Sequence, residues 1–218
     1  ILEKNKVILS EKQVKCGFWL YCRALFPGYL LSILWVEQFG AMMHILGAIG
    51  SIGQWLSVII ILLAFRKSFT FDKNRFSSLT NVTIQLTFLL LWIKSTLELG
   101  LIFPDLAALV YDTRSVIIGY LHLTLLGFIS LFIIAQMMML KMLSTTLITK
   151  LSLAIFFTGF FIMEVLLFLE GLFKWIDLHT FPFYIEGLLI TAILLAIGVL
   201  LFWTSFNRNW LHDSSFDQ

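Results

Sequence analysis

Long apolar stretches separated by short polar ones run through this chain from residue 17 to residue 206. Each stretch has roughly 20 residues or more, the length that a helix needs to cross the hydrocarbon core of a bilayer. The apolar positions do not alternate with polar ones, so the pattern is not that of membrane barrel strands. We predict six spans, at about Gly17–Val36, Phe39–Phe65, Leu79–Phe103, Ser115–Leu140, Leu151–Phe173 and Phe183–Phe206.

The composition excludes a soluble domain. Of the 218 residues, 60% are hydrophobic and 13% are charged, and the mean hydropathy is +0.96, whereas soluble domains are about half apolar and a quarter charged. The fold class is therefore all-α, a polytopic membrane bundle of six transmembrane helices. Residues 17–206 form the transmembrane domain, between an N-terminal segment (1–16) and a tail (207–218). Because Ile1 is not an initiator methionine, we expect this domain to work within a longer chain or a complex.

Lysine and arginine are distributed unevenly between the predicted loops. With six spans, one side of the membrane carries four in residues 1–16, four in residues 66–78, Lys141, Lys150 and Arg208, eleven in all. The other side carries only Arg114 and Lys174. Positively charged loops stay in the cytoplasm, so both termini are predicted to be cytoplasmic. We expect a multi-pass protein of a bacterial inner (cytoplasmic) membrane.

Several charged residues fall inside predicted spans. Lys94 and Glu98 are four residues apart on one face of the third span, a spacing at which opposite charges pair on a helix. Glu164 lies near the middle of the fifth span and has no partner at such a spacing. It is the candidate for a proton relay, because unpaired carboxyl groups inside spans often serve that role; the alternative is an acid that stays protonated. Glu170, near the end of the same span, is expected to be solvated.

Two histidines also lie within spans, His44 in the second and His122 in the fourth. His44 shares a stripe with Gly40, Ala48 and Ser51, so we expect it to face protein. Helical rise places His122 roughly 10 Å from the outer start of its span, and we expect the ionisable groups of the spans to gather around it. Both histidines are either packed core residues or ligands, because histidine is a common axial ligand of haem iron. Together they could clamp one haem b; a separate metal site is not expected.

The fourth span and the segment before it carry a family resemblance. IGYLHLTLLGFISLFI, preceded by WIKSTLELGLIFPDLAALVYDTRSV, resembles the C-terminal part of uncharacterised multi-spanning bacterial membrane proteins. These are similar in turn to haem–copper oxidase subunit I and NnrS-type proteins, with a recurring H-x-x-L-x-G-F/W pattern. The matching positions are His122, Leu125, Gly127 and Phe128. The chain has no adjacent histidine pair and no third histidine within a span, so the resemblance does not extend to a complete haem–copper centre.

Three functions fit these patterns. The resemblance implies a haem-associated membrane protein of respiratory type. A non-catalytic subunit that docks partners through its helices is the first alternative, and a proton-coupled transporter using Glu164, Lys94 and Glu98 is the second. Expected partners are the lipid bilayer and other proteins or further copies of the chain, and no nucleic acid. No phosphate loop, nucleophile elbow or metalloprotease motif occurs, so an enzymatic activity is left open and no catalytic residue is named.

Overall fold

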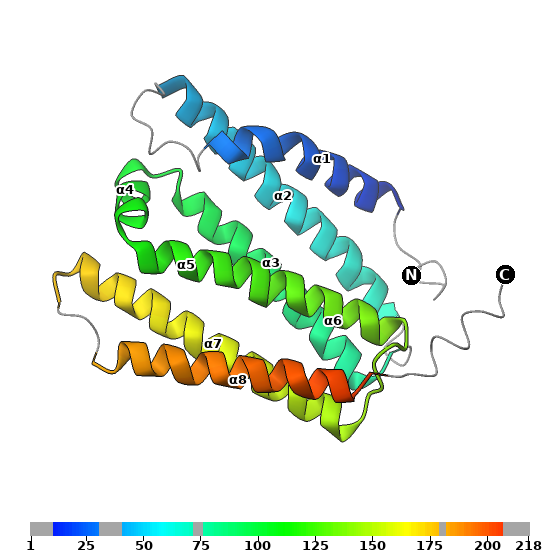
Figure 1. Cartoon of the computed structure of the whole chain (residues 1–218). Helices are drawn as coiled ribbons and strands as arrows, with labels where there is room; N and C mark the ends of the chain where they lie inside the picture. Colours follow the sequence, from blue (N-terminus) through cyan, green and yellow to red (C-terminus); the bar gives the residue numbers. More distant parts are fainter. Residues whose placement is uncertain (1–10, 31–40, 72–75, 179–181, 207–218) are drawn as a thin grey trace. The chain divides into compact units, whose positions relative to one another are not determined.

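A computed structural model describes residues 11–30, 41–71, 76–178 and 182–206, and these are helical with no regular strand (Figure 1). The helices are α1 (Glu11–Tyr29), α2 (Ala41–Phe71), α3 (Ser78–Gly100), α4 (Pro104–Asp112), α5 (Arg114–His122), the π-helical segment η2 (Leu123–Ile129), α6 (Ser130–Met139), α7 (Leu147–Trp175) and α8 (Tyr184–Thr204). The prediction of an all-helical protein is confirmed.

Five stretches of these helices are long and apolar enough to cross a membrane: Met42–Arg66, Ser78–Gly100, Arg114–Met139, Leu147–Trp175 and Tyr184–Thr204. They correspond to five of the six predicted spans and make the chain compatible with an integral membrane protein. The predicted first span continues into residues 31–36, which lie outside the described residues, and α1 is not among the five. Six spans and cytoplasmic termini therefore stay predictions.

The helix boundaries differ from the predicted ones at two connections. Helix α2 continues to Phe71, six residues into the segment expected to be a polar loop. At the other connection, α3 ends at Gly100 and Pro104 begins the new helix α4, where only a partly apolar connector was expected. Proline suits the first turn of a helix, because its missing N–H would have no partner there.

The chain forms two compact units. The α1–α4 unit comprises residues 2–75 and 88–114, and the α5–α8 unit comprises residues 76–87 and 115–218, so α3 contributes turns to both.

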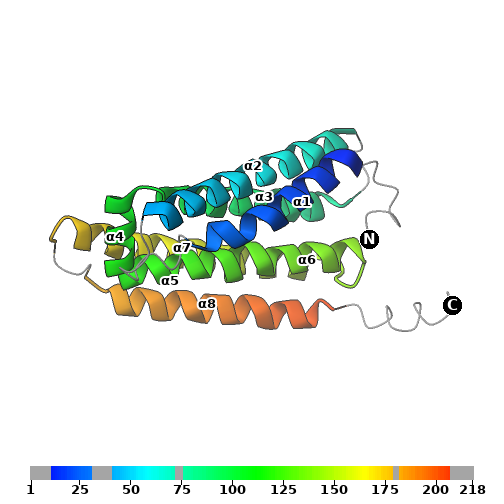
Figure 2. The ribbon, with the colours of Figure 1, turned by 90° about the horizontal axis from the view of Figure 1, so that it is seen from above.

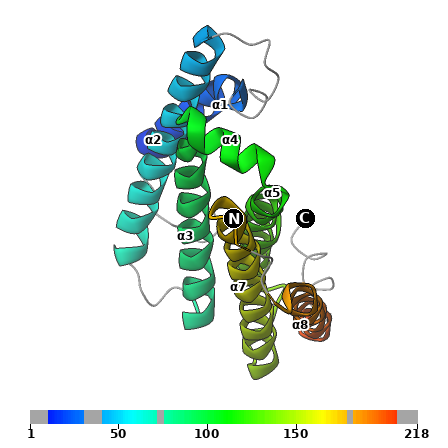
Figure 3. The same cartoon turned by 90° about the vertical axis from the view of Figure 1, so that its left-hand side faces the viewer.

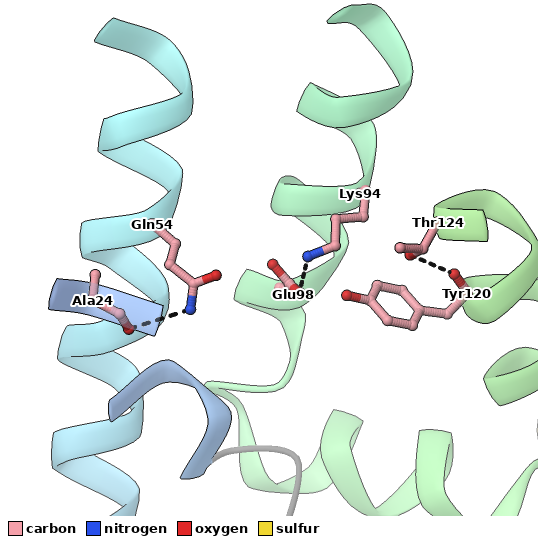
Figure 4. Close-up of polar contacts among 6 residues, drawn as sticks. All are labelled: Ala24, Gln54, Lys94, Glu98, Tyr120 and Thr124. Carbon is pink, nitrogen blue, oxygen red and sulfur yellow. Dashed lines mark hydrogen bonds and ion pairs between the residues drawn. The ribbon is translucent and has the colours of Figure 1, made fainter. Parts of the chain in front are cut away.

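In the α1–α4 unit, α1 and α2 pack closely as an antiparallel pair (Figure 2). A side chain at Gly50 would run into the backbone of Gly28 and Pro27, so small residues allow this approach. The Ser57 hydroxyl donates to the carbonyl of Gly17 at 2.6 Å. The amide of Gln54 donates to the carbonyl of Ala24 at 3.3 Å (Figure 4), which brings a donor to the part of α1 that Pro27 interrupts.

In the α5–α8 unit, α7 is the central helix and runs antiparallel beside α8 (Figures 1 and 3). In the apolar part of the α7 span, 44% of the residues are buried, compared with 17% in that of the α8 span. Gly198 of α8 lies against the backbone of Phe156, and the Ser152 hydroxyl donates to the Gly198 carbonyl at 2.8 Å. Close helix contacts of this kind hold membrane bundles together.

Candidate functional site

The ionisable residues of the predicted spans fall into both units. His44, Lys94 and Glu98 belong to the α1–α4 unit, and His122 and Glu164 belong to the α5–α8 unit. The sequence predicted one cluster around His122. Within a single unit, the structure brings Lys94 together with Glu98 and places His122 and Glu164 on neighbouring helices.

Lys94 and Glu98 form the predicted pair on α3. The Lys94 ammonium lies 2.5 Å from a Glu98 carboxylate oxygen (Figure 4), and the lysine is 9% exposed. Two opposite charges this close compensate much of the cost of carrying each one in a span. This prediction is confirmed, and the pair accounts for both charges without a ligand.

His44 is half-buried on α2, and its Nε2 lies 2.8 Å from the carbonyl oxygen of Ile102. A carbonyl only accepts, so Nε2 carries the proton and donates. The expectation that His44 faces protein is confirmed. Only Nδ1 of this ring remains to bind a ligand.

His122 is the last residue of α5 and directly precedes the π-helical segment η2. Its ring is half-buried, and Nδ1 is fully buried with no hydrogen-bond partner among the described residues. π-Helical turns are rare and occur frequently at functional sites. At this point the backbone changes from α-helical to π-helical winding, and η2 continues directly into α6. The Thr124 hydroxyl of η2 donates to the carbonyl of Tyr120 in α5 (Figure 4).

Glu164 lies in the core-facing stripe of α7 and is 7% exposed. Both carboxyl oxygens are buried, and neither has a hydrogen-bond partner among the described residues. A charge inside a span costs about 2.5–3.5 kcal/mol on insertion scales. Helix spacing on α7 also offers Glu164 no residue of opposite charge.

The contact between Gly119 and α7 fixes the levels of His122 and Glu164. A Cβ placed on Gly119 would lie 3.4 Å from Leu167 Cβ and 3.4 Å from the ring of Phe168. His122 is three residues after Gly119, and Glu164 is three residues before Leu167. Because α5 and α7 run antiparallel (Figure 1), both residues lie about 4.5 Å from this contact in the same direction along the helices. No hydrogen bond joins them.

Glu170 differs from its prediction. It was expected to be solvated, but it is 3% exposed, and its carboxylate lies 3.7 Å from the ammonium of Lys174. The four-residue spacing on α7 carries this pair. Lys174 lies in the last turn of α7, and half of its side chain is exposed. A partly exposed ammonium at the end of the helix therefore compensates the buried Glu170 carboxylate.

Ser115 was not predicted as a site residue. This residue lies in the first turn of α5, is 5% exposed, and its hydroxyl has no partner within the described ranges. The signal was present in its spacing, because Ser115 lies seven residues before His122 and therefore on the same helix face.

The donor atoms of the described residues bear on metal and cofactor binding. Among the described residues, no group of three or more histidine, cysteine, aspartate or glutamate side chains could hold a metal ion. For a haem, His122 offers its unpartnered Nδ1 and His44 its remaining Nδ1. The two rings belong to different units, so their clamping of one haem stays a prediction.

Comparisons with known proteins add no assignment to this site. No protein-family model, no curated protein and no solved structure matches the chain. The similarity of the fourth span to haem–copper membrane proteins therefore stays a prediction.

Proposed function

We propose that this chain is a proton-coupled membrane transporter in which Glu164 takes up and releases the proton. The single observation that carries this proposal is the Glu164 carboxyl group, buried in the central helix α7 with no partner for either oxygen among the described residues. Ionisable groups of this kind inside spans are expensive, and they mark proton relays and ion pathways.

Two other acids within the spans support this choice by contrast. Glu98 is paired with Lys94, and Glu170 lies 3.7 Å from the Lys174 ammonium. In both cases a cation of the chain compensates the carboxylate charge. Glu164 has no such cation beside it within the described residues, so a proton or a transported cation has to supply the compensation.

This arrangement favours exchange of a proton for a cation. With a proton bound, Glu164 is neutral and compatible with its apolar surroundings. After the proton leaves, the carboxylate carries an uncompensated charge that costs about 2.5–3.5 kcal/mol, and a cation that binds beside it lowers that cost. Proton and cation therefore compete for one carboxyl group, which is the requirement for coupled exchange.

Proton flux in proteoliposomes tests the proposal. Vesicles loaded with a pH-sensitive dye are acidified inside, and Na⁺, K⁺ or Li⁺ is added outside, with and without an imposed membrane potential. The wild-type protein should release protons faster than empty vesicles, and Glu164→Gln should reduce the rate to that of empty vesicles. Glu186→Gln, in the first turn of α8, is the matched control and should keep the wild-type rate. No flux from the wild-type protein, or full flux from Glu164→Gln, would overturn the proposal.

Haem binding is a second candidate, favoured by the Nδ1 of His122, which has no hydrogen-bond partner in the part of the chain that the structure describes. A ring nitrogen at this position could serve as an axial ligand of haem b, and the iron would supply electron-transfer chemistry. The visible spectrum of protein purified from haem-replete cells, before and after dithionite, tests this. A Soret band that His122→Ala abolishes supports haem binding, and a colourless preparation excludes it.

A further inference from the structure

The α5–α8 unit contains buried polar atoms that have no hydrogen-bond partner among the described residues. These atoms are Ser115 Oγ, His122 Nδ1 and both carboxyl oxygens of Glu164. Ser115 and Glu164 are 5% and 7% exposed. Buried polar groups in proteins are almost always hydrogen-bonded to protein or to ordered water, and a buried water binds where two to four polar partners converge.

These residues line the seam between α5 and α7. Ser115, Gly119 and His122 follow one another at spacings of four and three residues, so they share one face of α5. Gly119, at the middle of this face, has no side chain and lies against Leu167 and Phe168 of α7. Ser115 is about 6 Å from this contact toward the start of α5, and His122 and Glu164 are about 4.5 Å from it on the other side.

We propose that this seam holds a file of water molecules that leads from the Ser115 end of α5, past Gly119, to His122 and Glu164. The inference rests on the proposed function and adds the route by which protons reach Glu164. Ser115 and His122 act as positioning residues that hydrogen-bond the waters, and Gly119 is the narrow point. Beyond this level, the buried apolar side chains of Leu123 and Phe160, which are 5% and 2% exposed, close the seam. The route therefore opens at one end only.

Accessibility of introduced cysteines to silver ions tests the route without any transport measurement. Cys16 and Cys22, which are both free, are first replaced by serine. Ser115→Cys and His122→Cys are then made in the full chain, with Leu121→Cys as control at nearly the same depth, because Leu121 is 49% exposed on the outside of the unit. Silver in chloride-free buffer reacts with thiolates that contact water, and the thiols left over are counted with a fluorescent maleimide after unfolding.

Both seam positions should react at least about tenfold faster than Leu121→Cys, because thiolates form in water and not in hydrocarbon. Adding Gly119→Ala should slow the reaction of His122→Cys and leave that of Ser115→Cys unchanged, since Ser115 precedes the narrow point. The unchanged Ser115→Cys rate also shows that the variant is folded, and the 3.4 Å contacts at Gly119 leave room for a methyl group.

Equal rates at the seam and at Leu121 would overturn the inference, and so would a His122→Cys rate that ignores Gly119→Ala in a protein whose Ser115→Cys rate is preserved. Failure of the proposed function looks different. In that case the seam cysteines react quickly while wild-type proteoliposomes show no proton flux.

Discussion

The hydroxyl of Ser130 donates a hydrogen bond to the carbonyl oxygen of Leu125, five residues earlier, at 2.9 Å. On α3, by contrast, the hydroxyls of Thr83 and Thr87 donate to the carbonyl oxygens four residues earlier, those of Leu79 and Thr83. The difference arises from η2, where the backbone is wound with five-residue hydrogen bonds. Ser130 therefore satisfies a carbonyl oxygen of the π-helical turn that follows His122.

We predict that deleting Leu126 from η2 leaves the protein folded. A π-helical turn contains one residue more than an α-helical turn, so the deletion converts η2 to α-helix without rotating α5 relative to α6. The purified variant should elute as a monodisperse species, with a melting temperature close to that of the wild type.

Deletion of Ile133, an exposed residue of α6, is the matched control. One residue removed from an α-helix rotates all that follows by about 100°, so this variant should aggregate or melt much earlier. Equal damage from the two deletions would show that η2 is not an inserted turn.

The sequence predicted those features that depend on local spacing. Lys94 and Glu98 are four residues apart on one helix, so their pairing follows from helix geometry whatever surrounds them. The isolation of Glu164 was predicted in the same way, because no basic residue lies within one turn of it. The five helices that are long and apolar enough to cross a membrane followed from the length of the apolar stretches.

The features that depend on packing could not be predicted. A serine near the end of a span is usually solvated, and the burial of Ser115 depends on the approach of neighbouring helices. Glu170 was expected in solvent for the same reason. The winding of η2 depends on how its residues fit the unit, and its apolar sequence is equally compatible with an α-helix.

Replacing Lys94 by methionine should destabilise the protein by about 3 kcal/mol, because removing one partner leaves the Glu98 carboxylate in a span without its cation. The free energy of unfolding in mixed micelles measures the loss. The double variant Lys94→Met/Glu98→Gln removes both charges and should recover most of the stability. A double variant as unstable as Lys94→Met alone would show that the uncompensated charge of Glu98 is not the cause of the lost stability.

Gln54→Leu should lower the free energy of unfolding by about 1 kcal/mol, because the Ala24 carbonyl next to the proline-interrupted turn of α1 loses a donor in apolar surroundings. Ser57→Ala, which removes the second hydrogen bond from α2 to α1, should have an effect of similar size. Thermal unfolding of each variant gives the comparison. A neutral Gln54→Leu would show that the Ala24 carbonyl needs no second donor.

Two glycines of α8 should respond differently to the same substitution. A Cβ on Gly198 would lie 2.8 Å from Phe156 Cβ and 2.9 Å from its Cα and N, and this backbone cannot move away without separating α7 from α8. Gly198→Ala should therefore destabilise the protein by about 1–3 kcal/mol. A Cβ on Gly187 meets the end of the Leu166 side chain at 2.8 Å. This side chain can adopt another rotamer, so Gly187→Ala should change stability by less than about 0.5 kcal/mol.

The melting temperatures of the two variants give the comparison. Both substitutions gain the same helix propensity, so a difference between the two melting temperatures reports the effect of the contact between α7 and α8 at Gly198. Equal melting temperatures would mean that α7 and α8 are farther apart at Gly198 than the structure has them.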